Sequence, residues 1–350
     1  MTLQGEKLDR EGSLQALTDR AEAARSSISD ALALAADLGP VAPLPGSGRT
    51  ADAWRLLTTL AAVDLSVARA VEPHLDALAI LAQAGLADRI EDDGTHTGTW
   101  GVFAAEGPGV AVVASPGPDG WRLTGTKPWC SLADHLHRAI VTAHVGDGER
   151  RAFAVDLRSD AVTIDPPDAW VSRGLPSITS CSVHFDAATA IPVGGTNWYL
   201  HRDGFAWGGI GVAACWFGGA LGVARTMLTS AGRRAPDQIG LLHLGRVDAA
   251  LHEARTVLAE AADAVDSGRA SGQDGALLAA RVRSTVFRCA ELVLEAAAHG
   301  LGPAPLAFDE AHAARVADLT LYLRQHHAER DDAALGGRVL ARAAEGDVEW

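Results

Sequence analysis

The sequence is poor in the patterns that mark a disulfide-bonded or metal-bound domain. Its 350 residues include four cysteines, which lie far apart and form no Cys-x-x-Cys pair: Cys130, Cys181, Cys215 and Cys289. Disulfides or a zinc knuckle are therefore excluded as the organising element, and free thiols favour a reducing compartment. The dense histidine groups, 135–137 and 326–327, lack the further ligands of a metal centre. We predict no metal site.

Basic charge is scarce as well. Lys plus Arg is 30 and Asp plus Glu is 44, which gives a formal net charge of −14. A nucleic-acid-binding surface needs a basic face, and no long basic run is present, so nucleic acid is not an expected partner. The N-terminal segment has no apolar core of the signal-peptide type, so we expect a cytoplasmic protein.

One long uncharged run needs an explanation. Residues 205–224 contain no charged side chain and are numerous enough to cross a bilayer. Six of these twenty residues are glycine, and the run stands alone between charged residues. Helices that are apolar all round also occupy the centre of large soluble bundles. We interpret the run as a core helix, with Gly218 and Gly222 allowing close helix approach, and expect no membrane partner.

The residue pattern of the chain changes twice, from helical to β-prone and back to helical. Residues 13–38 and 51–90 are rich in Ala and Leu at helical spacing, and helical periodicity returns from residue 204. Between about 95 and 195, short β-prone runs alternate with Gly, Pro and Asp, which predicts an antiparallel barrel or sandwich. Three tryptophans, Trp100, Trp121 and Trp129, gather in this part, either as core filling or as a surface for a flat cofactor.

A set of motifs in this central part resembles the acyl-CoA dehydrogenase family. Residues 120–131, GWRLTGTKPWCS, resemble its pattern G-x-x-L-N-G-x-K-x-W-I-T/S. Residues 100–109 stand where the family has its T-E-P-x-x-G loop. Residues 173–177 and 183–192 resemble its G-x-R-x-S and F-x-x-V-x-V-P segments, and a glycine-rich helix follows at 206–228.

The resemblance implies an α+β fold in three parts. An N-terminal helical domain would span residues 1–94, a central antiparallel β-barrel domain 95–200 and a C-terminal four-helix bundle 201–350. It also implies a homo-oligomer, a dimer or tetramer, because related proteins place the FAD tail across a subunit boundary. An electron-transfer or reductase partner is implied in the same way.

The resemblance further implies a bound FAD between the β-domain and the C-terminal helices. Trp129 and Ser131 then become contacts of the flavin ring, and Phe103 and Glu106 line its pyrimidine side. A flavin needs hydroxyl and backbone donors at its polar edge and an apolar wall that excludes water. The alternative for Ser131 is an ordinary hydroxyl at a strand end.

Two expected phosphate contacts depart from the family pattern. Arg233 and Arg234 occupy the place of an R-x-x-F-G segment, whose arginine pairs with the FAD diphosphate of a neighbouring subunit, but the Phe-Gly is absent. Gly300 and Gly302 stand in place of a G-G-x-G turn. These departures predict weaker retention of FAD.

The catalytic position departs further. In the family, a glutamate removes the α-proton of an acyl thioester. At the usual position of that glutamate this sequence has Arg324–His326, and at the alternative position it has Val212–Ala213. An arginine that helps to hold CoA is missing too. Glu329, His326 and His327 remain as candidate bases, unless this segment is merely a solvated helix end.

Three functions therefore stay open. The first is FAD-dependent α,β-dehydrogenation of a small acyl thioester with a non-standard base. The second is a flavin-dependent monooxygenase on the same fold that takes reduced flavin from a partner reductase. The third is a non-catalytic homologue that acts as a partner subunit, since the base and the CoA arginine are both missing. We rank them in this order, and the sequence carries no marker of substrate identity.

Overall fold

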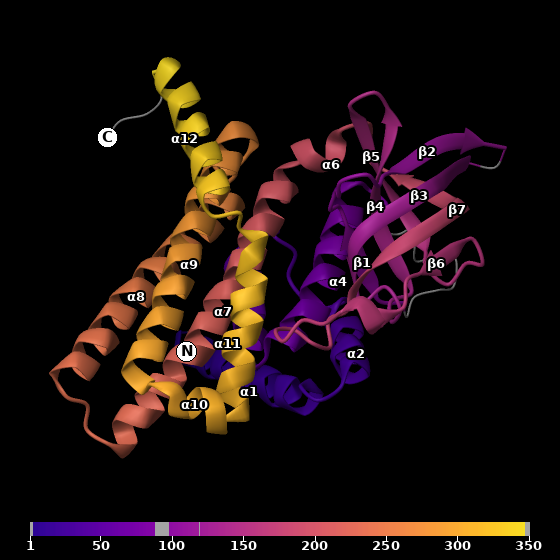
Figure 1. Ribbon diagram of the computed structural model, residues 1–350. Coiled ribbons are helices and arrows are strands. Elements are labelled where there is room, and N and C mark those ends of the chain that lie inside the picture. The colour runs from indigo at the N-terminus through magenta and orange to yellow at the C-terminus, as the bar shows by residue number, and fades with distance from the viewer. Residues whose placement is uncertain (1–2, 88–97, 119, 347–350) are drawn as a thin grey trace.

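The computed structural model describes residues 3–87, 98–118 and 120–346, with side chains from residue 14 onward. Helices come first, strands follow, and helices return, so the predicted α+β organisation is confirmed (Figure 1). The predicted domain limit at 94–95 lies outside the described residues. The limit predicted at 200–201 falls inside the short helix α6, Trp198–His201, which leads into α7.

Among the described residues of the N-terminal part, four helices are present: α1 Leu3–Ala24, α2 Ile28–Leu38, α3 Thr50–Val63 and α4 Leu65–Gln83. Helical periodicity alone does not separate α1 from α2. Ser27 marks the boundary because its side chain accepts a hydrogen bond from the backbone N–H of Asp30 and so caps α2. Asp64 ends α3, and its side chain caps α4 by accepting hydrogen bonds from the backbone N–H groups of Ser66 and Val67. These caps turn an alanine-rich stretch into short packed helices.

Seven strands form one sheet: β1 Trp100–Phe103, β2 Val112–Gly117, β3 Gly120–Ser131, β4 Arg138–Gly146, β5 Glu149–Asp156, β6 Val162–Ile164 and β7 Ser180–Val193. The pairing runs β4–β2–β3–β7–β5, and β5 pairs with β4 again, so the order of partners returns to its start. Five pairings are antiparallel, as predicted. The pairings β1–β4 and β2–β4 are parallel, so the expectation of a purely antiparallel domain is wrong.

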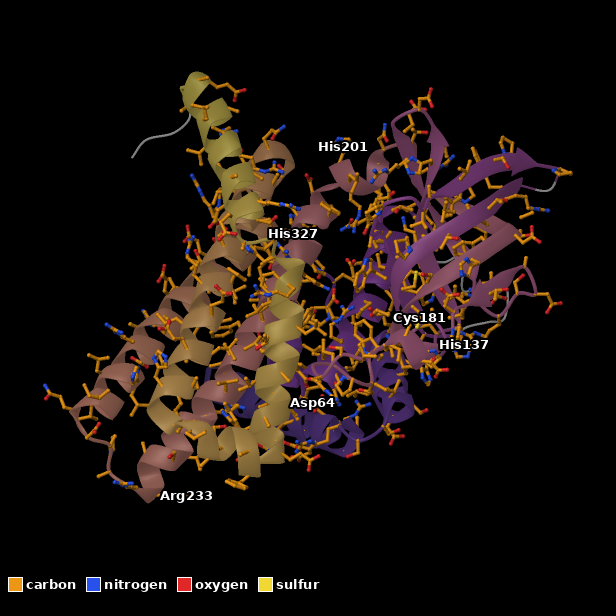
Figure 2. All side chains as sticks on the ribbon, in the orientation of Figure 1. Asp64, His137, Cys181, His201, Arg233 and His327 are labelled. Carbon is orange, nitrogen blue, oxygen red and sulfur yellow. The ribbon has the colours of Figure 1, made fainter. Side chains whose placement is uncertain are left out.

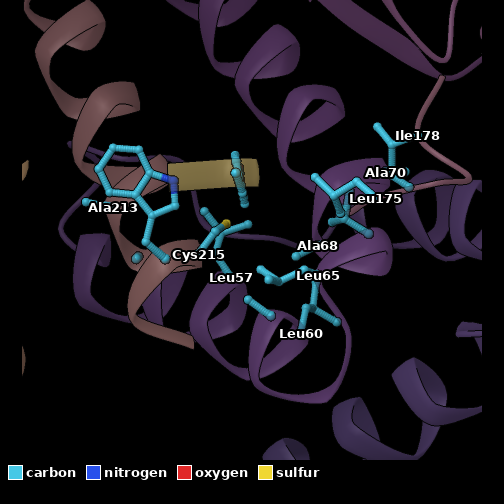
Figure 3. Packing of buried hydrophobic residues seen from close by; sticks show 14 of the residues in the cluster. Leu57, Leu60, Leu65, Ala68, Ala70, Leu175, Ile178, Ala213 and Cys215 are labelled. Atoms are coloured by element: carbon cyan, nitrogen blue, oxygen red, sulfur yellow. The ribbon is translucent and has the colours of Figure 1, made fainter. Parts of the chain in front are cut away.

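The C-terminal part consists of α7 Asp203–Arg233, α8 Gln238–Asp266, α9 Gly272–Leu301, α10 Pro303–Phe308, α11 Glu310–Tyr322 and α12 Glu329–Ala344. Among the described residues, α7 is the one helix long and apolar enough to span a membrane, and most of its apolar window is buried inside the fold. It packs against α3, α8, α9 and α11, as the core-helix prediction requires. Figure 3 shows Leu57 of α3, Leu65 of α4 and Cys215 of α7 converging in this core.

Close approach of α7 to α3 depends on glycine. A Cβ added at Gly218 would lie 2.4 Å from the carbonyl oxygen of Thr58, and one at Gly222 would lie 3.0 Å from that of Ala62. The two helices therefore touch backbone to backbone at this point. In Figure 1, α4 lies between the bundle and the sheet, and it packs against β1, α7 and α11. This makes α4 the element that joins all three parts of the chain.

Candidate functional site

A bulge in β3 presents Trp129 outward. The pairing of β3 with β7 passes from Lys127↔Val183 to Cys130↔Cys181, so β3 has one extra residue there. Trp129 takes φ 60°, an unusual value for a bulky residue. Its side chain is 63% exposed as a result. The bulge therefore offers a flat aromatic surface at the end of the resembling motif.

The other two tryptophans of the β-domain are not available in this way. Trp100 is buried in β1, with the guanidinium of Arg138 over its ring. Trp121 is half-buried and packs against Phe153, with ring centroids 5.4 Å apart. Core filling therefore explains these two residues, and Trp129 is the one placed to stack on a cofactor.

Ser131 lies two residues after Trp129 and reaches the N-terminal helices. Its Oγ accepts a hydrogen bond from Nη2 of Arg69 on α4 at 3.3 Å, and lies 2.8 Å from Oγ of Ser180 on β7. The Ser180 hydroxyl is 3.2 Å from the Ile178 carbonyl and can donate to it, so a consistent assignment has Ser131 donating to Ser180. Ser131 is thus part of a hydrogen-bonded chain and not a free strand-end hydroxyl.

Arg69 is also paired with a carboxylate. Its Nη1 lies 2.9 Å from Oε2 of Glu72 on the same helix, and about a tenth of each side chain is exposed. Burial raises the pKa of Glu72 to about 7, although the nearby guanidinium opposes that shift. The pair places a carboxyl group that titrates near neutrality one side chain away from Ser131.

Two buried polar atoms lie opposite this pair. Nε1 of Trp216 on α7 has no hydrogen-bond partner, whereas the hydroxyl of Tyr322, at the end of α11, lies beside Arg69 and the Cys215 thiol but forms no well-aligned hydrogen bond with them. The two rings meet edge to face at 6.4 Å. The Arg69 guanidinium lies over the Tyr322 ring, 5.1 Å from its centroid. Buried donors of this kind are rare in native proteins, and a bound ligand atom is one way to satisfy them.

The polar side chains of α4 continue along one face. Arg69, Glu72 and Asp76 recur at helical spacing, and we call these three residues the α4 polar stripe. Asp76 lies 3.8 Å from the guanidinium of Arg202, which also donates to Gln83. Burial raises the pKa of Asp76 despite Arg202.

Glycines of α7 leave room for these charged side chains. A Cβ added at Gly208 would approach Oδ1 of Asp76 to 3.0 Å, and one at Gly204 would meet the Arg202 guanidinium. The early glycines of α7 thus accommodate buried ionic side chains, a role that the sequence does not reveal.

The structure separates the three predicted bases. Glu329 and His327 are exposed, at and just before the start of α12. His326 is buried, stacks on Phe287 with ring centroids 4.2 Å apart, and accepts the amide of Ala328 at Nδ1. Burial lowers the pKa of His326, which keeps the ring neutral.

His326 is the one of the three that lies inside the fold. Its ring meets Trp216 edge to face at 6.2 Å, so Trp216 stands between it and Tyr322. The guanidinium of Arg283 lies over the Trp216 ring, 4.6 Å from its centroid. His326 therefore packs against Trp216 and Phe287, whereas Glu72 is linked to Ser131 through Arg69.

Phe103 and Glu106, expected on the pyrimidine side of a flavin, differ in setting. Phe103 is 2% exposed and is part of the core. Glu106 forms an ion pair with the buried Lys127 at 2.9 Å and lies 3.3 Å from Nε2 of His144. Burial opposes ionisation of Glu106, but the hydrogen bond and charge of Lys127, the charge of Arg150 and the hydrogen bond with His144 together lower its pKa. Glu106 therefore anchors Lys127, whose Nζ also donates to Thr142 at 2.9 Å.

The predicted phosphate contacts lie elsewhere. Arg233 ends α7 at the end of the bundle remote from the β-domain, as Figure 2 shows, and Arg234 follows it. Gly300 packs beside Met227 and His243 near the same end, and Gly302 follows α9 with φ 68°. Within one chain, these residues do not join Trp129 and Ser131.

A small hollow lies between the β-domain and α6. Its lining includes Ala104, Thr142, Arg150 and Tyr199. Trp129 and Ser131 do not line it. It is smaller than a typical cofactor pocket, so we do not assign the flavin ring to it.

The sequence motifs missed the residues of α4 and α11. Arg69, Glu72 and Asp76 interrupt an otherwise apolar helix at positions that share one face, and that pattern is visible in the sequence. Charges on the inward face of an apolar helix indicate a buried polar site. No comparable sequence pattern singled out Tyr322.

Comparisons with known proteins give structural matches alone. No protein-family model matches the sequence, and no curated protein matches it. KijD3, solved with FMN and dTDP-3-amino-2,3,6-trideoxy-4-keto-3-methyl-D-glucose, is 19% identical, with a TM-score of 0.77 over 98% of this chain and 93% of that one. TdsC from Paenibacillus sp. A11-2, solved with FMN and indole, is 16% identical, with a TM-score of 0.76 over 92% and 95%.

A dehydrogenase matches as well. Butyryl-CoA dehydrogenase from Megasphaera elsdenii is 16% identical, with a TM-score of 0.72 over 84% of this chain and 83% of that one. At these identities the likeness establishes the fold and leaves the reaction open.

Proposed function

Because the chain has the fold of the acyl-CoA dehydrogenases, we propose that it is a flavin-dependent oxidoreductase that binds the flavin ring against Trp129 and beside Ser131. The exposed ring of Trp129 on the β3 bulge carries this proposal. An aromatic side chain of that size stays in water at a cost in free energy unless a ligand covers it.

The residues around Trp129 fit such a group. Ser131 supplies a hydroxyl, and the buried hydroxyl of Tyr322 lies beside Arg69, the residue that donates to Ser131. The Arg69 guanidinium adds a fixed positive charge within reach of Ser131. A flavin bound there supplies hydride or electron transfer, and the chain supplies orientation, hydrogen bonds and exclusion of water.

Of the two flavin reactions, we propose the monooxygenase, with reduced flavin delivered by a partner reductase. The α4 polar stripe supports it, since Arg69 donates to Ser131 and pairs with Glu72, which puts buried charged side chains beside the proposed flavin site. Placing a fatty acyl chain against buried charges is unfavourable, whereas a polar or ring substrate satisfies them. KijD3 and TdsC, both solved with FMN, support the same choice.

We propose that flavin binding depends weakly on the adenylate half of FAD. Arg233, Arg234, Gly300 and Gly302 lie at the far end of the bundle, so in one chain that half meets none of its predicted contacts. A second copy of the chain in a homo-oligomer would have to supply them. FMN, which lacks the adenylate, needs no such contact.

A thioester dehydrogenase remains the second candidate, and Glu72 favours it. A buried carboxyl with a pKa of about 7 has the properties of a base for α-proton removal. It lies on α4 and not on the C-terminal helices, so it would be the displaced base that the sequence left unassigned.

An anaerobic flavin titration separates the two reactions. The protein is loaded with FMN or with FAD and mixed with acyl-CoAs of several chain lengths while the flavin absorbance is followed. The monooxygenase proposal predicts no bleaching, and oxygen consumption when a flavin reductase and NADH are present with a suitable polar substrate. Bleaching by any acyl-CoA would establish the dehydrogenase instead.

A further inference from the structure

Arg69 connects the residue expected to touch the flavin with a buried carboxyl. One nitrogen of its guanidinium donates to Ser131 at 3.3 Å, and the other lies 2.9 Å from Glu72. A guanidinium holds its nitrogens in a rigid plane, so the carboxylate and the hydroxyl are fixed relative to one another. The carboxyl of Glu72 is thereby held next to Arg69, which itself contacts Ser131 at the proposed flavin site, and both side chains are almost completely buried.

The groups that face Glu72 come from several elements. Arg69 and Asp76 lie on its own helix, Arg283 on α9, Cys215 on α7 and Tyr322 on α11. Tyr199 of α6 faces it too, beside Asp76 and Arg202.

Most of these groups keep the same protonation state near neutral pH. Burial raises the pKa of Cys215, Tyr199 and Tyr322, so all three stay protonated, and the arginines stay charged. Glu72, with a pKa of about 7, is therefore the group of this cluster expected to change charge near neutral pH, while burial also raises the pKa of Asp76.

We propose that Glu72 is a catalytic residue of the flavin site, the proton acceptor for the substrate, with Arg69 and Tyr322 as the positioning residues that hold it there. The inference rests on the proposed flavin site and extends it, since one guanidinium, that of Arg69, contacts both Glu72 and Ser131. It holds for either flavin reaction.

The proton step balances without a further reactant. The bond between the substrate atom and its hydrogen breaks, and the electron pair remains on that substrate atom. The proton forms a new O–H bond with a carboxylate oxygen of Glu72. Arg69 stays protonated throughout. While Glu72 holds the proton, the guanidinium faces a neutral carboxyl, and the ion pair forms again when Glu72 releases the proton to solvent.

The test uses the bound flavin as a reporter of the charge on Glu72. The visible spectrum of the full-length protein loaded with FMN is recorded across the pH range, for the wild type, Glu72→Gln and Asp76→Asn. Asp76→Asn is a matched control because it removes a buried carboxylate from the same face of α4, one turn further from Ser131. The wild type should show a transition near pH 7, and Asp76→Asn should keep it at a somewhat lower pH because the Asp76 carboxylate raises the pKa of Glu72. Glu72→Gln should show no such transition.

Arg69→Gln supplies a second variant in case Glu72→Gln fails to fold. Because the guanidinium lowers the pKa of Glu72, its removal should move the transition to higher pH. A transition that persists in Glu72→Gln, disappears equally in Asp76→Asn or keeps its midpoint in Arg69→Gln would overturn the inference. If the wild type binds neither FMN nor FAD, the proposed function itself is wrong, and the inference ends with it.

Discussion

Nη2 of Arg69 on α4 donates a hydrogen bond to Oγ of Ser131 on β3 at 3.3 Å. The N-terminal helices thus reach the strand residue that resembles the flavin-contacting hydroxyl of a known fold. Tyr322 at the end of α11 packs against the same guanidinium, so all three parts of the chain meet there. A site at the junction of three packed parts is enclosed by elements that are far apart in sequence.

Trp129 can be tested without disturbing the fold, since its side chain is 63% exposed. We expect Trp129→Ala to weaken FMN binding by about tenfold, because stacking of a planar ring on an aromatic side chain contributes about 1–3 kcal/mol. Isothermal titration calorimetry with FMN measures this. Leu340→Ala on α12, also at an exposed apolar residue, should leave the affinity unchanged. Equal affinities in wild type and Trp129→Ala would move the flavin away from the bulge.

His74 should make the protein sensitive to acid. Its Nδ1 accepts the amide of Trp100 at 3.2 Å, and burial lowers its pKa to about 4. The unfolded chain takes up this proton at about pH 6.5 and the folded chain does not, so the contribution to stability is complete above about pH 6.5 and declines as the pH falls towards 4. The loss approaches about 3 kcal/mol over that window.

Urea unfolding at several pH values checks this slope. His74→Asn, which keeps an acceptor for the Trp100 amide, should lose most of the extra acid sensitivity. His299→Asn, at an exposed position of α9, should retain it. A wild-type slope in His74→Asn would show that another group is responsible.

The ion pair of Lys127 and Glu106 should be more costly to break than to replace. Lys127 is 2% exposed, so Glu106→Gln leaves a buried charge without its partner and should destabilise the fold by about 3 kcal/mol. The double change Glu106→Gln with Lys127→Met should recover much of that loss, because no buried charge remains. Glu291→Gln, which breaks the exposed pair with Arg324, should cost less than about 1 kcal/mol. Urea melts compare the four proteins, and a double variant less stable than Glu106→Gln would contradict this account.

Two glycines of α7 should respond in opposite directions to alanine. A Cβ at Gly218 would lie 2.4 Å from the Thr58 carbonyl, so Gly218→Ala forces α3 and α7 apart and should lower the melting temperature. Gly232, near the end of the same helix, has no atom within 4 Å of an added Cβ. Gly232→Ala should raise stability by up to about 1 kcal/mol through helix propensity. Differential scanning calorimetry of both variants decides the matter, and a tolerated Gly218→Ala would mean that α3 and α7 do not touch there.

Local patterns were enough to predict most of the fold. Within the predicted β part, the β-prone runs at 121–127, 138–145 and 180–186 lie in β3, β4 and β7, and those at 110–115 and 151–157 overlap β2 and β5. The uncharged run at 205–224 is a buried helix. The parallel pairings of β4 could not be predicted, because strand order depends on contacts between distant residues and leaves no mark on local alternation. The strand β6, Val162–Ile164, was missed because three residues carry no period.

The candidate site was predictable in part, for the same reason. The β3 motif placed Trp129 and Ser131 near one another in sequence, and the structure keeps them together. The base candidates at 326–329 came from an ungapped comparison, and the structure shows that burial separates His326 from the exposed Glu329. Glu72 was missed because its importance depends on α4 lying between the sheet and the bundle, and that arrangement is set by tertiary packing.

The most direct measurement is the visible absorption spectrum of the purified protein titrated with FMN, for the wild type and for Trp129→Ala. The account predicts a shifted, saturable flavin spectrum in the wild type, and weaker binding in Trp129→Ala with the fold intact. A wild-type protein that leaves the spectra of both FMN and FAD unchanged would contradict the proposed flavin site, and the exposed Trp129 would then need another ligand.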